Sequence, residues 1–377
     1  MSSVLIFGDT VRFPELRREV PHAVADPFLY VEHGGDRYAI VRSLEVARMR
    51  QVDGLEPLPL EDFGLDELVA GGTDSEAALV EIAARACDRL GISTAIVPGN
   101  FPVEVADRLR AAGVRLDVQR DLFNERRRAK TPSQLEGVRK ATRAAEAGTA
   151  AIAACLRESE QIDGVVHYDA EPLTSERLKV AAAQAFLASE AVADEFIVAH
   201  GEQTCIGHHM GSGTVLVGEP ITVDLWPRDP ESGYHTDMTR TFVVGPVSDE
   251  LRAYHRLCEE ALAKAIAAIR PGVRGSELHT IASEVFEAGG FQSQLSKEPG
   301  EVLLDGFFHG LGHGVGLEVH EAPSLDLSGG ELIAGDVVAV EPGCYRQGYG
   351  GVRLEDLVLV TEDGSEVLTS YPYALEP

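Results

Sequence analysis

The sequence lacks any segment that would carry the chain into or across a membrane. No apolar run approaches the length of about 20 residues that a membrane-spanning helix needs. The N-terminus also lacks the basic stretch followed by an apolar stretch that marks a secretory signal. The sequence therefore predicts a cytoplasmic protein without a membrane partner.

Cysteine is scarce, and its spacing follows no known pattern. The five cysteines are scattered, odd in number and never spaced as CxxC: Cys87, Cys155, Cys205, Cys258 and Cys344. Reduced thiols fit this pattern better than disulfides or a zinc knuckle. We therefore expect no disulfide framework to hold the fold together.

Positive charge is also in short supply. Lysine and arginine together number 33 against 61 aspartates and glutamates, which gives a net charge of −28. Such a charge argues against nucleic acid or an anionic membrane as the main partner, and it leaves carboxylates that can serve cations. The length of 377 residues, with 44% hydrophobic and 25% charged residues, is that of an ordinary globular protein with room for two domains.

The first third of the chain predicts a compact α/β domain. Strands are expected at residues 4–8, 28–32, 38–41, 94–98 and 114–118, and helices at residues 76–90 and 102–112. Strands and helices alternate, and no cluster of residues here carries chemistry. We therefore expect this domain to serve as a scaffold or a subunit contact.

A basic stretch at residues 124–130 follows this domain. It holds three consecutive arginines and a lysine, with little apolar content. This composition predicts a linker, either solvated or clamped onto acidic neighbours. Thr131, Pro132 and Gln134 then provide a strong helix start. We place the domain boundary near residue 128.

Two stretches of the second domain repeat one pattern. Each has a glycine, then an acid, then an apolar strand that ends in another acid six residues after the glycine; the first ends at Asp224 and the second at Glu341. A further acid follows each one, Asp237 after 13 residues and Glu355 after 14 residues. We infer two related halves, each with a hairpin that carries two carboxylates.

A glycine-rich stretch at residues 309–323 holds His309, His313 and His320. Neutral imidazole is a good metal ligand and a good proton carrier near neutral pH. The glycines let the backbone pass close to an ion or a substrate. The spacing fits neither a HExxH zinc helix nor a GxGxxG dinucleotide loop. A glycine-rich loop with incidental histidines is the alternative interpretation.

The four acids and one of these histidines together predict a metal site. Four carboxylates beside valine, isoleucine and leucine would be costly to bury without cations. With one histidine they suit a pair of divalent ions such as Mn²⁺ or Co²⁺, and Zn²⁺ is a further option. Two such ions about 3.5–4 Å apart would hold a hydroxide between them and polarise a carbonyl, which is the chemistry of amide hydrolysis.

The motifs around these residues resemble those of the pita-bread (creatinase-fold) metallopeptidases, which include prolidase, aminopeptidase P, methionine aminopeptidase and the metal-free creatinases. The similar motifs are Thr-Asp-Met-Thr-Arg-Thr at 236–241, Gly-His-Gly at 312–314, Glu-Pro-Gly at 341–343 and Arg-Leu-Glu-Asp at 353–356. The resemblance covers the whole chain and implies an α+β fold. In that fold an N-terminal α/β creatinase-like domain at residues 1–127 precedes a pita-bread catalytic domain at residues 128–377 with pseudo-twofold repeated halves.

The resemblance implies five metal ligands: Asp224, Asp237, His313, Glu341 and Glu355. By this similarity Asp237 and Glu355 bridge both ions, Asp224 holds one ion, and His313 and Glu341 hold the other. Two divalent ions per chain are implied, with Mn²⁺ preferred over Co²⁺ or Zn²⁺. Creatinases lack these ligands, so the full set argues against creatine hydrolysis.

Four further residues resemble catalytic groups of the family. His208 is similar to the histidine that contacts substrate near the scissile bond, and His209 is its alternative because the segment that follows is one residue short of the usual spacing. His309 and His320 are similar to the two further active-site histidines. Arg353 is similar to an arginine beside the bridging glutamate.

The chain departs from the family pattern in its first hairpin. Trp226 stands where the family usually has glycine, and the hairpin is longer than usual. These departures concern the shape of the substrate pocket rather than the metal site. His235, in the same hairpin, is expected to be a surface residue of a strand.

The resemblance implies a two-metal exopeptidase that cleaves Xaa-Pro bonds, as an Xaa-Pro dipeptidase or an aminopeptidase P, with a proline-containing peptide as its substrate. It also implies a homodimer or larger assembly formed through the N-terminal domain. Two alternatives stay open. One is a pita-bread lyase or hydrolase that uses the same metals on a small non-peptide substrate, and the other is a catalytically dead binding protein.

Overall fold

The chain divides into two units, the first ending at Arg127 and the second running from Arg128 to Pro377. The computed structural model describes residues 3–377. Within this range, no helix has the length and apolar character needed to span a membrane.

The N-terminal unit is built on a six-stranded mixed sheet with the strand order β4-β3-β2-β1-β5-β6. Its strands are β1 (Ser3–Gly8), β2 (Phe28–His33), β3 (Asp36–Val41), β4 (Leu55–Pro59), β5 (Thr94–Val97) and β6 (Arg115–Val118). Its α-helices are α1 (Pro14–Glu19), α2 (Val46–Met49), α3 (Leu65–Ala70), α4 (Ser75–Arg89) and α5 (Val103–Ala111), followed by α6 (Arg120–Arg128). Strand β1 pairs antiparallel with β2 and parallel with β5.

Both faces of this sheet are buried. Successive side chains of a strand point to opposite faces, and β1 accordingly sends Leu5 and Phe7 into one hydrophobic core and Val4 and Ile6 into another. A strand that is covered on both faces needs apolar residues at every position. This explains the uninterrupted apolar run at the start of the sequence.

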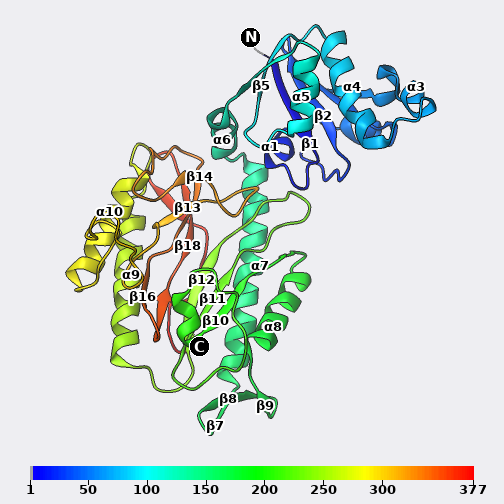
Figure 1. The fold of residues 1–377 in the computed structure, drawn as a ribbon. Coiled ribbons are helices and arrows are strands. Elements are labelled where there is room, and N and C mark those ends of the chain that lie inside the picture. The colour runs from blue at the N-terminus through cyan, green and yellow to red at the C-terminus, as the bar shows by residue number, and fades with distance from the viewer. Residues whose placement is uncertain (1–2) are drawn as a thin grey trace. The chain divides into compact units, whose positions relative to one another are not determined.

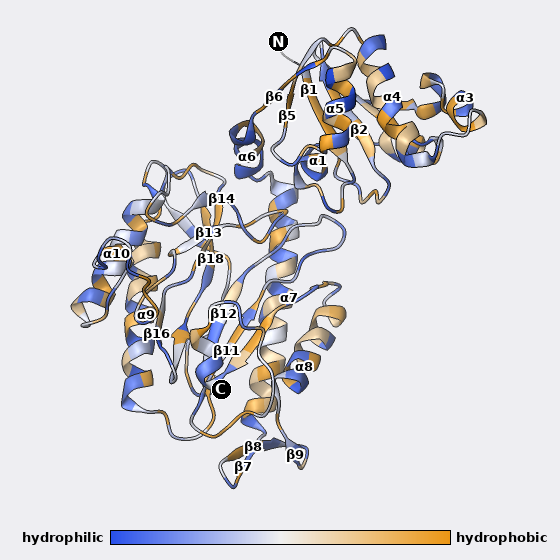
Figure 2. Ribbon diagram, viewed as in Figure 1, coloured by the Kyte–Doolittle hydropathy of each residue, from blue (hydrophilic) through white to orange (hydrophobic). Residues whose placement is uncertain are grey.

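Residues 120–128 form helix α6, so the prediction of a linker at residues 124–130 was wrong for most of that stretch. The helix is largely hydrophilic (Figure 2), which is why its composition resembled that of a connector. Arginine is nonetheless a good helix former, Phe123 is buried, and Arg126 bonds both carboxylate oxygens of Glu32 at 2.7 and 2.9 Å. The basic residues are therefore clamped onto acids rather than solvated.

The C-terminal unit holds its central strands between two pairs of helices (Figure 1). The helices are α7 (Pro132–Arg157) and α8 (Ser175–Ala188) in the first pair, and α9 (Asp249–Ala268) and α10 (Gly275–Ala288) in the second. Helix α7 begins with the predicted capping box of Thr131 and Gln134. The helices that precede each strand pair along the chain therefore cover opposite sides of the central strands.

Four small sheets make up the β-structure of the C-terminal unit. The strands of the C-terminal unit are β7 (Glu160–Ile162), β8 (Val165–Tyr168), β9 (Glu171–Pro172), β10 (Ile197–His200), β11 (Pro220–Leu225), β12 (Met238–Val243), β13 (Gly312–Gly314), β14 (Glu321–Ser324), β15 (Val337–Val340), β16 (Gly343–Arg346), β17 (Gly350–Arg353), β18 (Asp356–Val360) and β19 (Ser365–Val367). The strand orders of these sheets are β10-β11-β12, β14-β13-β15-β18-β19, β16-β17 and β7-β8-β9.

The predicted repeat is present as two antiparallel strand pairs. Strand β11 pairs with β12, which sets Asp224 opposite Thr239, and β15 pairs with β18, which sets Val340 opposite Asp356. In the second copy the residues that connect the two strands form the hairpin β16–β17. The spacing of the acids did not reveal this hairpin.

Arg240, on β12, joins the two halves. Its buried guanidinium donates to Asp356 Oδ1 at 2.9 Å and to the backbone oxygen of Glu355 at 2.6 Å. The guanidinium also lies 4.6 Å from the ring centre of Tyr373. The backbone N–H of Glu355 donates to the carbonyl of Thr239 at 3.1 Å. These contacts fix β12 against β18 at the level of the second acid of each half.

Replacing Arg240 with alanine should destabilise the C-terminal unit strongly. Asp356 would stay buried without its ionic partner, and breaking a buried ion pair from one side typically costs about 3–5 kcal/mol. Urea unfolding gives this free energy. Arg252→Ala is the matched control, because the pair of Arg252 with Glu376 is exposed and should cost at most about 1 kcal/mol. Equal losses in both variants would contradict the role given to Arg240.

Candidate metal centre

A cavity of about 540 Å³ lies in the C-terminal unit, and all five predicted metal ligands line it. Asp224 lies near the end of β11 and Asp237 directly before β12, while Glu341 follows β15 and Glu355 precedes β18. His313 lies on β13, which pairs with β15. The ends of strands from both halves therefore deliver the five side chains to one place.

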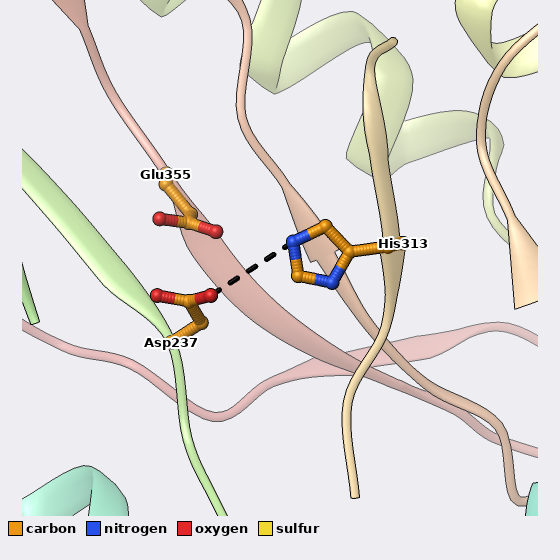
Figure 3. A group of neighbouring side chains, drawn as sticks. All are labelled: Asp237, His313 and Glu355. Atoms are coloured by element: carbon orange, nitrogen blue, oxygen red, sulfur yellow. Dashed lines mark ion pairs between the residues drawn. The ribbon is translucent and has the colours of Figure 1, made fainter. Parts of the chain in front are cut away.

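Asp237, His313 and Glu355 point toward one another (Figure 3). Their ligand atoms all lie within 4.8 Å of one another. His313 Nε2 is 3.8 Å from Asp237 Oδ2 and 3.7 Å from Glu341 Oε1. These separations are too long for hydrogen bonds. They leave space between the oxygen and nitrogen atoms that could bind a metal ion.

The carboxylates of the cluster repel one another in a buried setting. Burial raises the pKa of Asp237 well above its usual value, and the nearby charges of Glu355, Asp224 and Glu341 raise it further. The pKa of Glu355 is also raised well above its usual value, first by burial and then by Asp224 and Glu341. Burial raises the pKa of Glu341 to about 8. Such a group of acids ionises together only when cations compensate its charge.

Two further observations fit a divalent metal. Asp237 Oδ1 is buried and has no hydrogen-bond partner among the described residues. His313 donates from Nδ1 to the carbonyl of Gly314 at 3.1 Å, which leaves the Nε2 lone pair to face the carboxylates. Burial lowers the pKa of His313 to about 4, so that the ring is neutral. Four carboxylates and one neutral imidazole suit hard-to-borderline divalent ions.

Arg353 balances part of this negative charge. Its Nη2 lies 2.5 Å from Asp224 Oδ2, and its Nη1 donates to the Tyr345 hydroxyl at 3.3 Å. Thr239 donates to Glu355 Oε2 at 2.7 Å. Neither Tyr345 nor Thr239 was singled out from the sequence, because a tyrosine or a threonine within a strand looks like any other core residue.

Tyr345 also bonds His309, and this contact shows which ring nitrogen of His309 carries the proton. The Nδ1 of His309 lies 2.7 Å from the carbonyl of Gly310, and its Nε2 lies 3.0 Å from the Tyr345 hydroxyl. A carbonyl only accepts, so Nδ1 carries the proton and Tyr345 donates to Nε2. Burial lowers the pKa of His309 to about 3. His309 is thus a neutral ring with both nitrogens bonded within the protein.

The remaining predicted histidines take different places. His208 lines the cavity, whereas His209 is absent from its described lining and accepts from the N–H of Gly211 at 3.0 Å. His320 lines the cavity and packs its ring edge-on against His313, with centroids 4.2 Å apart. Burial lowers the pKa of His320. The structure therefore brings His208 rather than His209 to the candidate site.

The first hairpin contributes Trp226 to the cavity, as expected, but it places His235 differently from its prediction. Trp226 lines the cavity, together with other apolar side chains: Ile197, Met210, Phe308 and Val319. His235 is half-buried, its Nδ1 lies 3.2 Å from the carbonyl of Trp226, and burial lowers its pKa. The prediction that His235 lies on the surface was wrong, because its backbone N–H donates to the carbonyl of Gly316 at 2.7 Å and holds this part of the hairpin against the glycine-rich stretch.

The chain is similar to known peptidases in sequence. A profile of metallopeptidase family M24 matches residues 136–362. The chain is 35% identical to the Xaa-Pro dipeptidase of Pyrococcus furiosus over 183 residues, which cover 48% of this chain and 49% of the relative. It is 29% identical to the putative dipeptidase YkvY of Bacillus subtilis over 326 residues, which cover 85% and 83%. The match spans about half the length of the first relatives.

Solved structures share the fold of the chain. Prolidase from Pyrococcus furiosus superimposes with a TM-score of 0.78 at 24% identity, covering 99% of this chain and 97% of that one. The X-Pro aminopeptidase from Thermotoga maritima gives a TM-score of 0.79 at 22% identity, with the same coverage. The predicted pita-bread architecture is thereby confirmed, and the profile match shows that this chain belongs to metallopeptidase family M24.

Proposed function

We propose that this chain is a metal-dependent exopeptidase that hydrolyses Xaa-Pro bonds. The observation that carries the proposal is one cavity lined by three buried carboxylates (Asp224, Asp237 and Glu355), the half-buried Glu341 and His313. Family membership supports the reaction class, and relatives bear the names Xaa-Pro dipeptidase and dipeptidase. A binding protein without activity would have no need to keep so costly a cluster.

The five ligand residues would hold two divalent ions, with Mn²⁺ as the preferred metal. By the family resemblance Asp237 and Glu355 would hold both ions, Asp224 would hold one, and His313 and Glu341 would hold the other. When bound, divalent ions supply a Lewis acid for the peptide carbonyl and make water a better nucleophile at neutral pH. We further propose that the N-terminal unit, residues 1–127, mediates assembly into a homodimer.

The residues around the metal ligands have separate tasks. Arg353 holds Asp224 in place, and Tyr345 with His309 keeps Arg353 oriented from its other side. His208 and His320 are the lining histidines for which the structure gives no hydrogen-bond partner among the described residues. They are placed to hydrogen-bond the substrate. The apolar wall around Trp226 excludes water and offers a surface for the proline ring.

The charges of the lining favour peptides that continue beyond proline. A second cavity of about 410 Å³ shares His309, His313, His320 and Glu341 with the first, and it extends past Ser324 and Asp326. Among the described residues that line either cavity, Arg353 is the one lysine or arginine, and Asp224 already pairs with it. The free carboxylate of an Xaa-Pro dipeptide would therefore enter without a basic partner.

A panel of peptides tests both the reaction and this preference. We expect Mn²⁺-dependent cleavage of Xaa-Pro-Xaa tripeptides with kcat/KM at least about tenfold above that of the matching Xaa-Pro dipeptides, which corresponds to about 1.4 kcal/mol. Peptides with alanine in place of proline are the control and should be cleaved slowly. Equal or faster cleavage of the dipeptides would contradict the preference. Failure on every peptide, with turnover of a small non-peptide substrate, would favour the lyase or hydrolase alternative.

The bridging acids should differ from the outer acid in their effect on metal content. Glu355→Gln keeps the size of the side chain but removes its charge, so both ions lose a ligand; we expect lower metal content and no rescue by excess Mn²⁺. Asp224→Asn is the matched comparison, with one ion retained and partial rescue at high Mn²⁺. Atomic emission gives the metal bound per chain. Two ions and full activity in Glu355→Gln would overturn the two-metal assignment.

His320 should act on the substrate rather than on the metal. Its ring lines the cavity beside His313, where an N–H can donate to the carbonyl oxygen of the scissile bond as negative charge develops. Loss of one such donor typically lowers kcat by about 10²–10³-fold. His320→Ala should therefore keep its metal content and lose most of its activity, whereas His209→Ala, outside the described lining, should lose little. Near-normal turnover in His320→Ala would remove this residue from the mechanism.

A further inference from the structure

A completely buried ion pair lies next to the candidate metal centre without lining its cavities. Lys130 Nζ is 2.6 Å from Glu321 Oε1, and the two side chains are 0% and 1% exposed. Lys130 directly precedes the N-cap of α7, and Glu321 is the first residue of β14. Glu321 also follows directly after His320, so that the pair acts on the backbone that carries this histidine.

The Glu321 carboxylate fills the inside of the loop that carries His320. A Cβ at Gly316 would lie only 2.6 Å from Glu321 Cδ and 2.8 Å from its Oε2, so the backbone at Gly316 rests directly on the carboxylate. The loop is closed by the pairing of Gly314 with Glu321. Any movement of this carboxylate would therefore move the loop between the two histidines His313 and His320.

A buried ion pair fixes the geometry of its side chains more than it stabilises the fold. A buried ion pair is often no more stabilising than apolar residues of the same volume, but a short, charge-assisted hydrogen bond fixes direction and distance. Resting on the proposed function, we propose that Lys130 is a positioning residue of the active site. By holding Glu321 it fixes residues 314–320 and keeps the His320 ring against His313 and facing the substrate.

A second buried ion pair from the same basic stretch provides a matched control. Arg128 bonds Asp336 through Nε and Nη2 at 2.9 and 2.7 Å, and the two side chains are 9% and 0% exposed. Asp336 lies directly before β15, and neither of its chain neighbours lines the described cavities. Loss of this pair should therefore affect stability while leaving the Glu321 carboxylate and its contact with Gly316 in place.

The test compares two double variants in which each pair becomes apolar: Lys130→Met with Glu321→Leu, and Arg128→Met with Asp336→Leu. We expect kcat to fall by at least about tenfold in the first, with KM and the metal bound per chain little changed. The second should keep kcat within about threefold of the wild type at a comparable loss of Tm. Wild-type kcat in the first double variant would overturn the proposal.

Amide hydrogen exchange supplies a readout that does not depend on turnover. Peptides that cover residues 314–321 should exchange faster in the first double variant than in the wild type or the control. This result would stand even if no Xaa-Pro peptide were cleaved, so a failure of the proposed function is distinguishable from a failure of the positioning role. Unchanged exchange in this loop would contradict the role.

Two milder variants serve if the first double variant does not fold. Glu321→Gln keeps the size of the side chain and a neutral acceptor for Lys130, and Lys130→Arg keeps the charge. In Glu321→Gln we expect kcat to fall, by less than in His320→Ala, and residues 314–321 to exchange faster than in the wild type. In Lys130→Arg we expect both kcat and exchange to lie closer to the wild type than in Glu321→Gln. Wild-type values of kcat and exchange in Glu321→Gln would overturn the proposal.

Discussion

The confinement of like charges in one largely buried pocket governs this structure. Four carboxylates from four strand ends face one another, and burial raises the pKa values of Asp237, Glu341 and Glu355. Arg353 is the one lysine or arginine in the described lining of the cavity, and it cannot balance four acids. The fold therefore holds together a group of side chains that its own charges would drive apart. Divalent cations held by these acids would resolve this conflict, which is the proposed reason for the acidic cluster.

The duplicated architecture supplies the rigidity that such a site needs. Each half contributes one antiparallel strand pair with acids at its ends, and helices cover each pair from its own side (Figure 1). Two buried arginines then have different tasks. Arg240 ties the two strand pairs together through Asp356, and Arg353 partners Asp224 within the site. Because the pairs are fixed by backbone and arginine contacts, the fold itself holds the acids in their places.

The features of the site that follow from local sequence patterns and motifs could be predicted from the sequence. The acids at strand ends recur with a regular spacing, and the five candidate ligands do line one cavity. Contacts between residues far apart in the sequence could not be predicted from it. Lys130 and Glu321 are 191 residues apart, and Tyr345 reveals its link to His309 only in three dimensions. Helix α6 was missed because the ion pairs of its arginines with distant acids cannot be read from the sequence.

The central claim is that the carboxylate cluster binds two divalent ions. The direct measurement is X-ray diffraction from crystals grown with Mn²⁺, recorded on both sides of the manganese absorption edge. The account predicts two anomalous peaks in the cavity, with Asp237 and Glu355 in contact with both, and His313 Nε2 in contact with one. A single peak, or peaks that lie away from these residues, would contradict it.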